Sequence, residues 1–134
     1  MTKHPHQTSQ RLGRYHLLDM ISHGGMAEIY RAKYFDDNNK EHIVAIKRIL
    51  STLADDEDTI KGLIVEAKIS SLLEHPAVVN IQEFCQLQDE YFMVMELVDG
   101  LDLKTINKKL HSLNSLFSQM DAAYVVKNVL QGLE

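Results

Sequence analysis

Residues 21–30 read Ile21-Ser22-His23-Gly24-Gly25-Met26-Ala27-Glu28-Ile29-Tyr30, and residues 44–47 read Val44-Ala45-Ile46-Lys47. The paired glycines of the first stretch predict a tight hairpin turn, because glycine adopts turn conformations without steric cost. The β-branched and aromatic residues around both stretches favour strands. Residues 36–40 are rich in turn-forming side chains and separate the second strand from the third. This half of the chain therefore predicts an antiparallel meander, with strands expected at residues 15–21, 27–34 and 43–49.

The second half of the chain changes from strand to helix periodicity. Apolar residues recur at helical spacing from Asp58 to Glu74, and Pro76 is expected to end that helix. Ser118 and Asp121 resemble a capping pair for a last helix. The remaining elements are expected to be strands at 78–87 and 91–98 and helices at 101–110 and 122–134. Because no βαβ crossover or internal repeat occurs, the pattern predicts an α+β fold with a five-stranded antiparallel sheet and one main helix.

Composition excludes several classes of protein. The chain has 134 residues, of which 45% are hydrophobic, which suits one packed domain. The formal net charge is −5, from 14 basic and 19 acidic residues, whereas nucleic-acid binding needs a basic surface. We therefore expect no nucleic-acid partner. The seven histidines include no i,i+4 pair and no neighbouring cysteine, so we expect no metal site on the protein itself.

The single cysteine bears on the cellular compartment. Cys85 has no partner for a disulfide within the chain, which favours a reducing environment, so we expect a cytoplasmic protein. Residues 1–10 are polar and lack the apolar segment of a secretory signal. No run approaches the ~18 apolar residues of a membrane span. A membrane anchor in a longer parent protein is left open.

The glycine turn is a candidate phosphate-binding loop. Phosphates need backbone N–H groups at close range, and Gly24, Gly25, Ala27 and Ser22 leave little side chain in the way. Ile21 and Ile29 would flank the turn as an apolar cover for a base. An ordinary hairpin is the alternative, because Gly-Gly is a common hairpin turn.

Lys47 and Glu66 are a candidate ion pair. Strand alternation places Val44 and Ile46 on one face and Ala45 and Lys47 on the other, where small Ala45 leaves room for a flat ring. Glu66 lies among apolar residues of the main helix, where a carboxylate is costly unless it is paired. Lys47 is the obvious partner. The alternatives are a solvent-facing strand lysine and a glutamate at the margin of the apolar stripe.

The stretch Tyr91 to Gly100 is a third candidate element of a site. A strand there runs out of the sheet into a short connector before a helix. Free backbone groups on such a connector could bind the edge of an adenine. A linker without a ligand is the alternative.

The order and spacing of these features resemble the serine/threonine protein kinases of eukaryotic type, particularly bacterial members, from about Tyr15 onward. The resemblance implies a kinase small lobe followed by the hinge and the first helices of a truncated large lobe. It implies that residues 21–29 cover the phosphates of ATP, that Lys47 binds the α- and β-phosphates, and that Glu66 pairs with Lys47 in the active state. Further positions match the gatekeeper (Met95), the adenine-binding hinge (Glu96 and Val98) and the acidic residue near the ribose (Asp102). The implied domains are a flexible tail at 1–14, a small lobe at 15–98 and an incomplete large lobe at 99–134.

Two departures from the family's pattern bear on function. The loop pattern Gly-x-Gly-x-x-Gly has Ser22, Gly24 and Ala27 at its glycine positions, which predicts a stiffer loop. In addition, no His-Arg-Asp, Asp-Phe-Gly or Ala-Pro-Glu occurs in the sequence. No residue can therefore be assigned the family's catalytic aspartate or its metal-binding groups, and the Mg²⁺ ligands are expected in a part of the domain that this chain lacks.

These features predict the ATP-binding portion of a serine/threonine kinase that does not transfer phosphate as this chain alone. The parent enzyme would use ATP with Mg²⁺ and a protein substrate. One alternative is a pseudokinase or a regulatory nucleotide- or protein-binding module, which the altered loop suggests. Another is a short interaction protein with a kinase-like sheet as its scaffold. We also expect exposed apolar surface on the last helix and around the hinge, and self-association through it.

Overall fold

The computed structural model describes residues 10–50 and 56–133. The chain divides into two compact units. One, the sheet unit, comprises Met1–Leu73 and Asn80–Leu97, and the other, the helical unit, comprises Glu74–Val79 and Val98–Glu134. The chain therefore passes between the units three times, after residues 73, 79 and 97.

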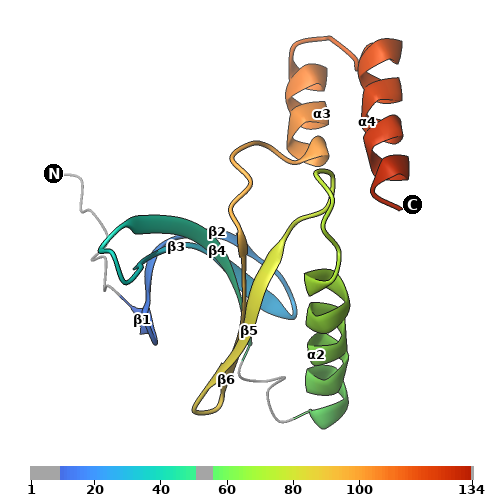
Figure 1. Ribbon diagram of the computed structural model, residues 1–134. Helices are drawn as coiled ribbons and strands as arrows, with labels where there is room; N and C mark the ends of the chain where they lie inside the picture. The colour runs from blue at the N-terminus through green and yellow to red at the C-terminus, as the bar shows by residue number, and fades with distance from the viewer. Residues whose placement is uncertain (1–9, 51–55, 134) are drawn as a thin grey trace, which may run out of the picture. The chain divides into compact units, whose positions relative to one another are not determined.

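The sheet unit contains an antiparallel sheet with the strand order β1-β2-β3-β4-β6-β5 (Figure 1). Its strands are β1 (Arg11–Leu12), β2 (Tyr15–His23), β3 (Ala27–Phe35), β4 (Glu41–Ile49), β5 (Ile81–Leu87) and β6 (Glu90–Glu96). The predicted meander and the two later strands are confirmed within a few residues. The later strands differ from the prediction mainly at their ends, because β5 starts only at Ile81 and β6 ends at Glu96.

The sixth strand, β1, corrects the expected five-stranded sheet. Arg11 and Leu12 pair with His16 and Tyr15, and Leu12 is 1% exposed in the core. The prediction of a flexible tail at 1–14 is therefore wrong for residues 11–14, because burial of Leu12 holds this short strand in place. Residues 1–9 of that prediction lie outside the described residues.

One helix of the sheet unit, α2 (Glu57–Ser71), packs on one face of the sheet. Asp56 caps its N-terminus, and Ile60, Leu63 and Ala67 are buried. The helix ends at Ser71, well before the expected terminator Pro76. Its last turn tightens, since the backbone N–H of Leu72 donates to Ile69 and Ser70, and Leu72 is 82% exposed, so no packing supports a further turn.

Two apolar cores occupy the two faces of the sheet. The first core contains the buried residues Leu12, Tyr15, Leu17, Ala32, Val44, Ile46, Phe92 and Val94. The second core joins the sheet to α2 and contains Ile49, Ile60, Leu63, Ala67 and Met93. The predicted strand alternation at residues 44–47 is thus confirmed, because Val44 and Ile46 both belong to the first core.

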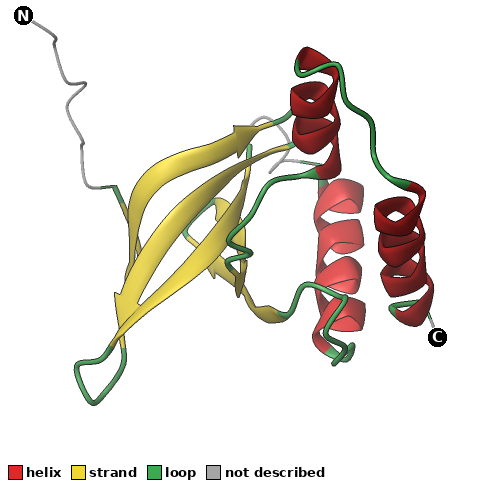
Figure 2. Ribbon diagram, turned by 90° about the horizontal axis from the view of Figure 1, so that it is seen from above, coloured by secondary structure: helices red, strands yellow, loops and turns green. Residues whose placement is uncertain are grey.

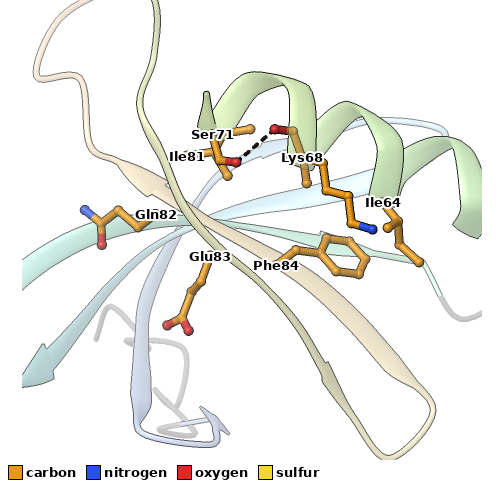
Figure 3. Close-up of a pocket in the computed structure, with 8 residues that line it drawn as sticks. Ile64, Lys68, Ser71, Ile81, Gln82, Glu83 and Phe84 are labelled. Atoms are coloured by element: carbon orange, nitrogen blue, oxygen red, sulfur yellow. Dashed lines mark hydrogen bonds between the residues drawn. The ribbon is translucent and has the colours of Figure 1, made fainter. Parts of the chain in front are cut away.

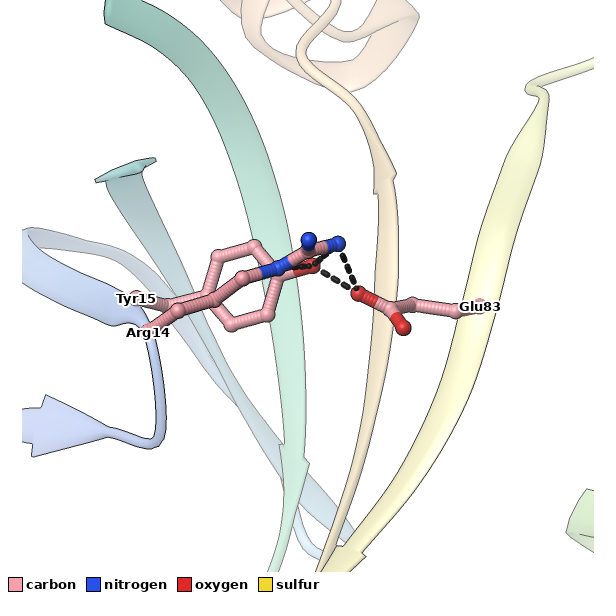
Figure 4. A network of polar contacts seen from close by, with 3 residues as sticks. All are labelled: Arg14, Tyr15 and Glu83. Carbon is pink, nitrogen blue, oxygen red and sulfur yellow. Dashed lines mark hydrogen bonds and ion pairs between the residues drawn. The ribbon is translucent and has the colours of Figure 1, made fainter. Parts of the chain in front are cut away.

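A clasp of three side chains joins the two edges of the sheet (Figure 4). Arg14 follows β1 at one edge, and its Nη2 lies 2.8 Å from Oε1 of Glu83 on β5, the opposite edge strand. The Tyr15 hydroxyl donates to the same Glu83 oxygen and accepts from the Arg14 guanidinium. The sheet is therefore curled so that its first core lies inside the curl.

The helical unit contains α3 (Leu103–Ser112) and α4 (Gln119–Gln131), which form a helical hairpin (Figures 1 and 2). Asp102 caps α3 and Ser118 caps α4, where the Ser118 hydroxyl accepts from the Asp121 N–H at 3.0 Å. The predicted cap is confirmed, and it starts α4 three residues earlier than expected. Gly132 ends the helix where a Cβ would lie only 3.2 Å from Val78, so a side chain there would crowd the 74–79 segment.

Neither helix of this hairpin has a buried residue. Large apolar side chains are exposed on it instead, among them Met120 and Leu133. In the described ranges, no helix is both long enough and apolar enough to cross a bilayer.

Candidate functional site

The glycine turn between β2 and β3 is short and open. Strand β2 extends through His23, so the turn contains only residues 24–26 and not Ser22 as expected. The Gly24 N–H donates to the Ala27 carbonyl at 2.9 Å, and the Leu50 N–H donates to the Met26 carbonyl at 3.1 Å. A Cβ built on Gly25 meets nothing within 4 Å. The tip of the hairpin is thus closed by backbone hydrogen bonds and leaves free space beside its glycines.

One face of the sheet brings four of the predicted site residues together. Ile29 lies opposite Lys47 in the β3–β4 ladder, and Ala45 lies opposite Met95 in the β4–β6 ladder. Ala45 is buried, and Met95 packs against the core shared with α2. This face therefore places the apolar residues Ala45 and Met95 beside a lysine ammonium, as the sequence predicted.

Helix α2 supplies the carboxylate partner of that lysine. Lys47 Nζ lies 3.6 Å from Glu66 Oε1, an ion-pair distance that is longer than a direct hydrogen bond. The Glu66 side chain is 56% exposed, so the expectation of a carboxylate embedded in apolar surroundings is wrong. The two residues nevertheless meet. Because one partner is solvated, the pair contributes to the direction of Lys47 more than to stability.

Other predicted residues of the hairpin lie elsewhere. Ile21 is half exposed beside an irregular step in the β2–β3 ladder. His23 Nε2 lies 3.9 Å from Glu28 Oε1, and Glu28 also lies 4.0 Å from Arg48 Nη1. Arg48 follows Lys47 on the same strand, so it points to the opposite face. The side chains of His23 and Glu28 are therefore turned away from the Lys47 face.

The predicted hinge residues have contacts of their own. The Glu96 carboxylate accepts from the Asn80 N–H at 2.9 Å, and the Glu96 N–H donates to the Asn80 carbonyl at 3.0 Å. Asp102 accepts from the Thr105 N–H at 2.7 Å and from its hydroxyl at 2.8 Å, which lowers the pKa of the Asp102 carboxyl. Val98 and Asp102 belong to the helical unit, whereas the other candidates belong to the sheet unit. Their adenine and ribose roles stay predictions.

Two features of the sheet unit were not found from the sequence. The first is a cavity of about 290 Å³ between α2 and β5, with Ile64 and Lys68 of the helix facing Phe84 of the strand (Figure 3). The second is the clasp at Glu83, beside which burial and the Glu83 charge raise the pKa of the Cys85 thiol to about 11. Both depend on tertiary contacts to β5, which no local pattern in the sequence marks.

Comparison with known proteins identifies the family. Residues 15–134 match the family model described as the protein kinase domain. The chain belongs to the protein kinase family. The kinase domain thus includes the whole sheet from Tyr15 onward and both helices of the helical unit.

Curated kinases are similar over most of this chain. The serine/threonine-protein kinase PrkC of Bacillus subtilis is 38% identical over 107 residues, which cover 78% of this chain and 16% of PrkC. The serine/threonine-protein kinase PknD of Chlamydia caviae is 37% identical over 103 residues, which cover 77% and 11%. The tyrosine-protein kinase MasK of Myxococcus xanthus is 36% identical over 96 residues, which cover 72% and 15%. This chain therefore spans 11–16% of the length of these relatives.

Solved kinase structures share the fold. The Mycobacterium tuberculosis PknI kinase domain superposes with a TM-score of 0.78 at 16% identity, covering 96% of this chain and 49% of that domain. The apo form of PpkA-294 superposes with a TM-score of 0.62 at 22% identity, covering 78% and 43%. The predicted kinase-like fold is confirmed, with six strands in place of five.

Proposed function

We propose that this chain is the ATP-binding portion of a serine/threonine protein kinase. The observation that carries the proposal is the Lys47–Glu66 pair at 3.6 Å, which sets an ammonium beside Ala45 and Met95. In protein kinases, a strand lysine held by a helix glutamate orients the nucleotide phosphates. Two of the relatives are named serine/threonine kinases and one a tyrosine kinase, so tyrosine is the alternative acceptor.

The residues of the Lys47 face fit a nucleotide. Ala45 is small, and the space beside Gly25 is open, so a ring and phosphates would meet little steric obstruction. When bound, ATP supplies the phosphoryl group that a kinase transfers. This chain's own contribution is to hold the ammonium of Lys47 and the backbone N–H groups of the glycine turn in place.

The described residues do not fit a resident metal ion. They bring together no group of three His, Cys, Asp or Glu side chains, and Glu66 already faces Lys47. The described residues therefore offer Mg²⁺ no ligand set. With no residue assigned to the catalytic base either, we propose that the 134-residue chain alone does not transfer phosphate.

A second candidate function is a pseudokinase or a regulatory nucleotide- or protein-binding module. Ser22 and Ala27 at two of the three glycine positions favour it, since both lie within the strands that flank the turn. Binding of ATP without turnover fits both functions. The double substitution Ser22→Gly with Ala27→Gly would raise ATP affinity if the altered turn had lost it. We also propose a cytoplasmic location, which the single half-buried Cys85 supports.

Calorimetric titration with Mg·ATP tests the proposal. We expect the wild-type chain to bind and Lys47→Ala to bind at least about tenfold more weakly, because loss of an ion pair to phosphate costs about 1.4 kcal/mol or more. Lys33→Ala is the matched control, a strand lysine that pairs with Glu41 at 2.8 Å on the same sheet. Equal binding by wild type and Lys47→Ala would contradict the proposal. A radiolabel transfer assay should show no turnover beyond background.

A further inference from the structure

A row of four charged or ionisable side chains crosses the sheet at the base of the glycine turn. This charge row consists of His23, Glu28, Arg48 and Glu90, from β2, β3, β4 and β6, four strands that lie side by side. His23 pairs with Glu28 in register, and Glu28 with Arg48. Their signs alternate along the row when His23 is protonated. Opposite charges on neighbouring strands attract, so the row links four strands, although Glu90 lies two residues along β6 from Phe92, the residue opposite Arg48.

The contacts of Arg48 within the charge row are partly shielded from solvent, whereas the His23 side chain is 60% exposed. Glu28 accepts a hydrogen bond from the Tyr30 hydroxyl at 2.9 Å and lies 4.0 Å from Arg48, and Arg48 donates to Glu90. The Arg48 and Glu28 side chains are each 20% exposed. Burial lowers the pKa of the Arg48 guanidinium, but the hydrogen bond to Glu90 and the charges of Glu90, Tyr30 and Glu28 together outweigh burial and raise that pKa. Such pairs are screened less by salt than fully exposed ones.

The charge row lies on the face opposite the candidate nucleotide surface. Glu28 and Arg48 form one pair of the β3–β4 ladder, and the adjacent pair is Ile29 and Lys47. Successive residues of a strand point to opposite faces, so Arg48 cannot touch a ligand that lies against Lys47. Arg48 is, however, the next residue after Lys47 on β4, and its side chain pairs with Glu28 on β3, the strand that follows the glycine turn.

The β2–β3 hairpin that carries the glycine turn is irregular, so its position depends on contacts outside its own ladder. The β2–β3 ladder has register shifts between Leu17 and Asp19 and between Met20 and Ser22, just before the turn. Irregular steps of this kind disrupt the ladder locally and bend the strand. The β3–β4 ladder is regular over all nine pairs from Ala27 to Phe35. The charge row thus ties the irregular hairpin to the regular part of the sheet.

We propose that Arg48 is a positioning residue for the glycine turn, acting through Glu28. The ATP affinity then depends on a side chain that ATP does not touch. This inference rests on the proposed function, because it assumes that the turn covers the phosphates. Adenosine has no phosphates, so its affinity depends much less on Arg48 than the ATP affinity does.

The test compares the affinities of the full chain for ATP and for adenosine, and both are measured by NMR chemical-shift titration. Arg48→Met should weaken ATP binding about fivefold, the order expected for a partly exposed ion-pair network, and change adenosine affinity less than about twofold. Arg48→Lys keeps the charge and should recover part of the loss. Glu28→Gln, a neutral isostere, should weaken ATP binding similarly and serves as the second variant if Arg48→Met does not fold. Lys33→Met, at the far end of the same ladder, should change neither affinity.

The outcomes separate this inference from the proposed function. Wild-type ATP affinity in both Arg48→Met and Glu28→Gln would overturn the inference alone. An equal loss for ATP and adenosine would also overturn it, since Arg48 would then only hold the unit together. Absence of ATP binding by the wild-type chain would overturn the proposed function, and this inference with it.

Discussion

The sheet unit and the helical unit use their apolar residues in opposite ways. In the sheet unit, each face of the sheet carries an apolar core, and buried residues such as Ile46 and Val94 are fully excluded from solvent. In the helical unit, neither α3 nor α4 has a buried residue, and Met120 and Leu133 are 82% and 78% exposed. Both units have amphipathic elements. Only in the sheet unit do the apolar faces of these elements pack against another element, as α2 does against the sheet.

This difference shows which part of the chain can be stable by its own contacts. Burial of apolar area is the main favourable term in folding, and it is concentrated in the two cores of the sheet unit. The helices α3 and α4 have good caps at Asp102 and Ser118. Caps define where a helix starts, but an isolated hairpin of short helices gains little stability without burial.

The largest expected contrast is in core truncation. Ile46→Ala should lower the free energy of unfolding by about 2–5 kcal/mol, because it removes buried methylene groups and leaves a cavity. Leu130→Ala on α4, where the side chain is 58% exposed, should change it by less than about 0.5 kcal/mol. Urea unfolding followed by far-UV circular dichroism measures both. Equal effects would show that α4 is buried in solution and would remove the contrast between the units.

The next contrast is in self-association. The exposed apolar residues of the helical unit should drive association of the chain, and Met120→Lys with Leu130→Lys should weaken it about tenfold. Leu87→Lys, at an exposed position 40% accessible on the sheet unit, is the control. Sedimentation velocity over a concentration series gives the association constants. A strictly monomeric wild-type chain at high concentration would contradict the expectation.

The smallest contrast is between two helix caps. Hydrogen bonds from Thr59 to Asp56 and from Thr105 to Asp102 lower the pKa of both carboxyl groups. With a lowered folded-state pKa, each cap stabilises its helix above the ordinary aspartate value of 3.8, and the effect is lost as the pH falls through the lowered value. Asp56→Ala should lower the free energy of unfolding of the whole sheet unit. Asp102→Ala should reduce only the helicity of α3.

Circular dichroism between about pH 6 and about pH 2, together with amide hydrogen exchange, resolves the two cap variants. Each variant should lose the pH dependence that its carboxylate contributes. Faster amide hydrogen exchange in the sheet unit of Asp102→Ala would show that the two units unfold together and would contradict the expected difference between the two caps.

The sequence predicted correctly those parts of the fold that depend only on neighbouring residues, such as the alternation of side chains along a strand. The alternation around Lys47 placed Val44 and Ile46 in one core because a strand has a period of two, whatever it packs against. The same rule could not find β1, since two residues carry no periodicity and only burial of Leu12 holds them. The end of α2 was misassigned for a similar reason, because Pro76 marks where a helix must stop and not where its packing ends.

The candidate site shows the same division. Lys47 and Glu66 were matched because a carboxylate among apolar helix residues needs a partner and because the resemblance to kinases implies the pair, and they do meet, although Glu66 is exposed and not embedded among apolar residues. The charge row was missed because its Arg48–Glu90 contact depends on the pairing of β4 with β6, two strands far apart in sequence, which composition does not reveal. His23 and Glu28 were assigned to the turn that covers the nucleotide, which stays a prediction, and their side-chain contacts, His23 with Glu28 and Glu28 with Arg48, were not foreseen.

The strand order has a consequence for the path of folding. Strand β4 pairs with β6 and not with β5, the next strand along the chain. The backbone groups on one edge of β4 therefore stay unpaired until residues 90–96 have been synthesised. The clasp between Arg14 and Glu83 joins residues 69 positions apart, and closing a long loop costs entropy before any contact is gained. The β2–β3–β4 meander can form early from short-range contacts, whereas addition of β6 and β5 and closure of the curl come late. During translation, the nascent meander therefore exposes an unpaired strand edge rich in β-branched residues, the kind of edge that chaperones protect from aggregation.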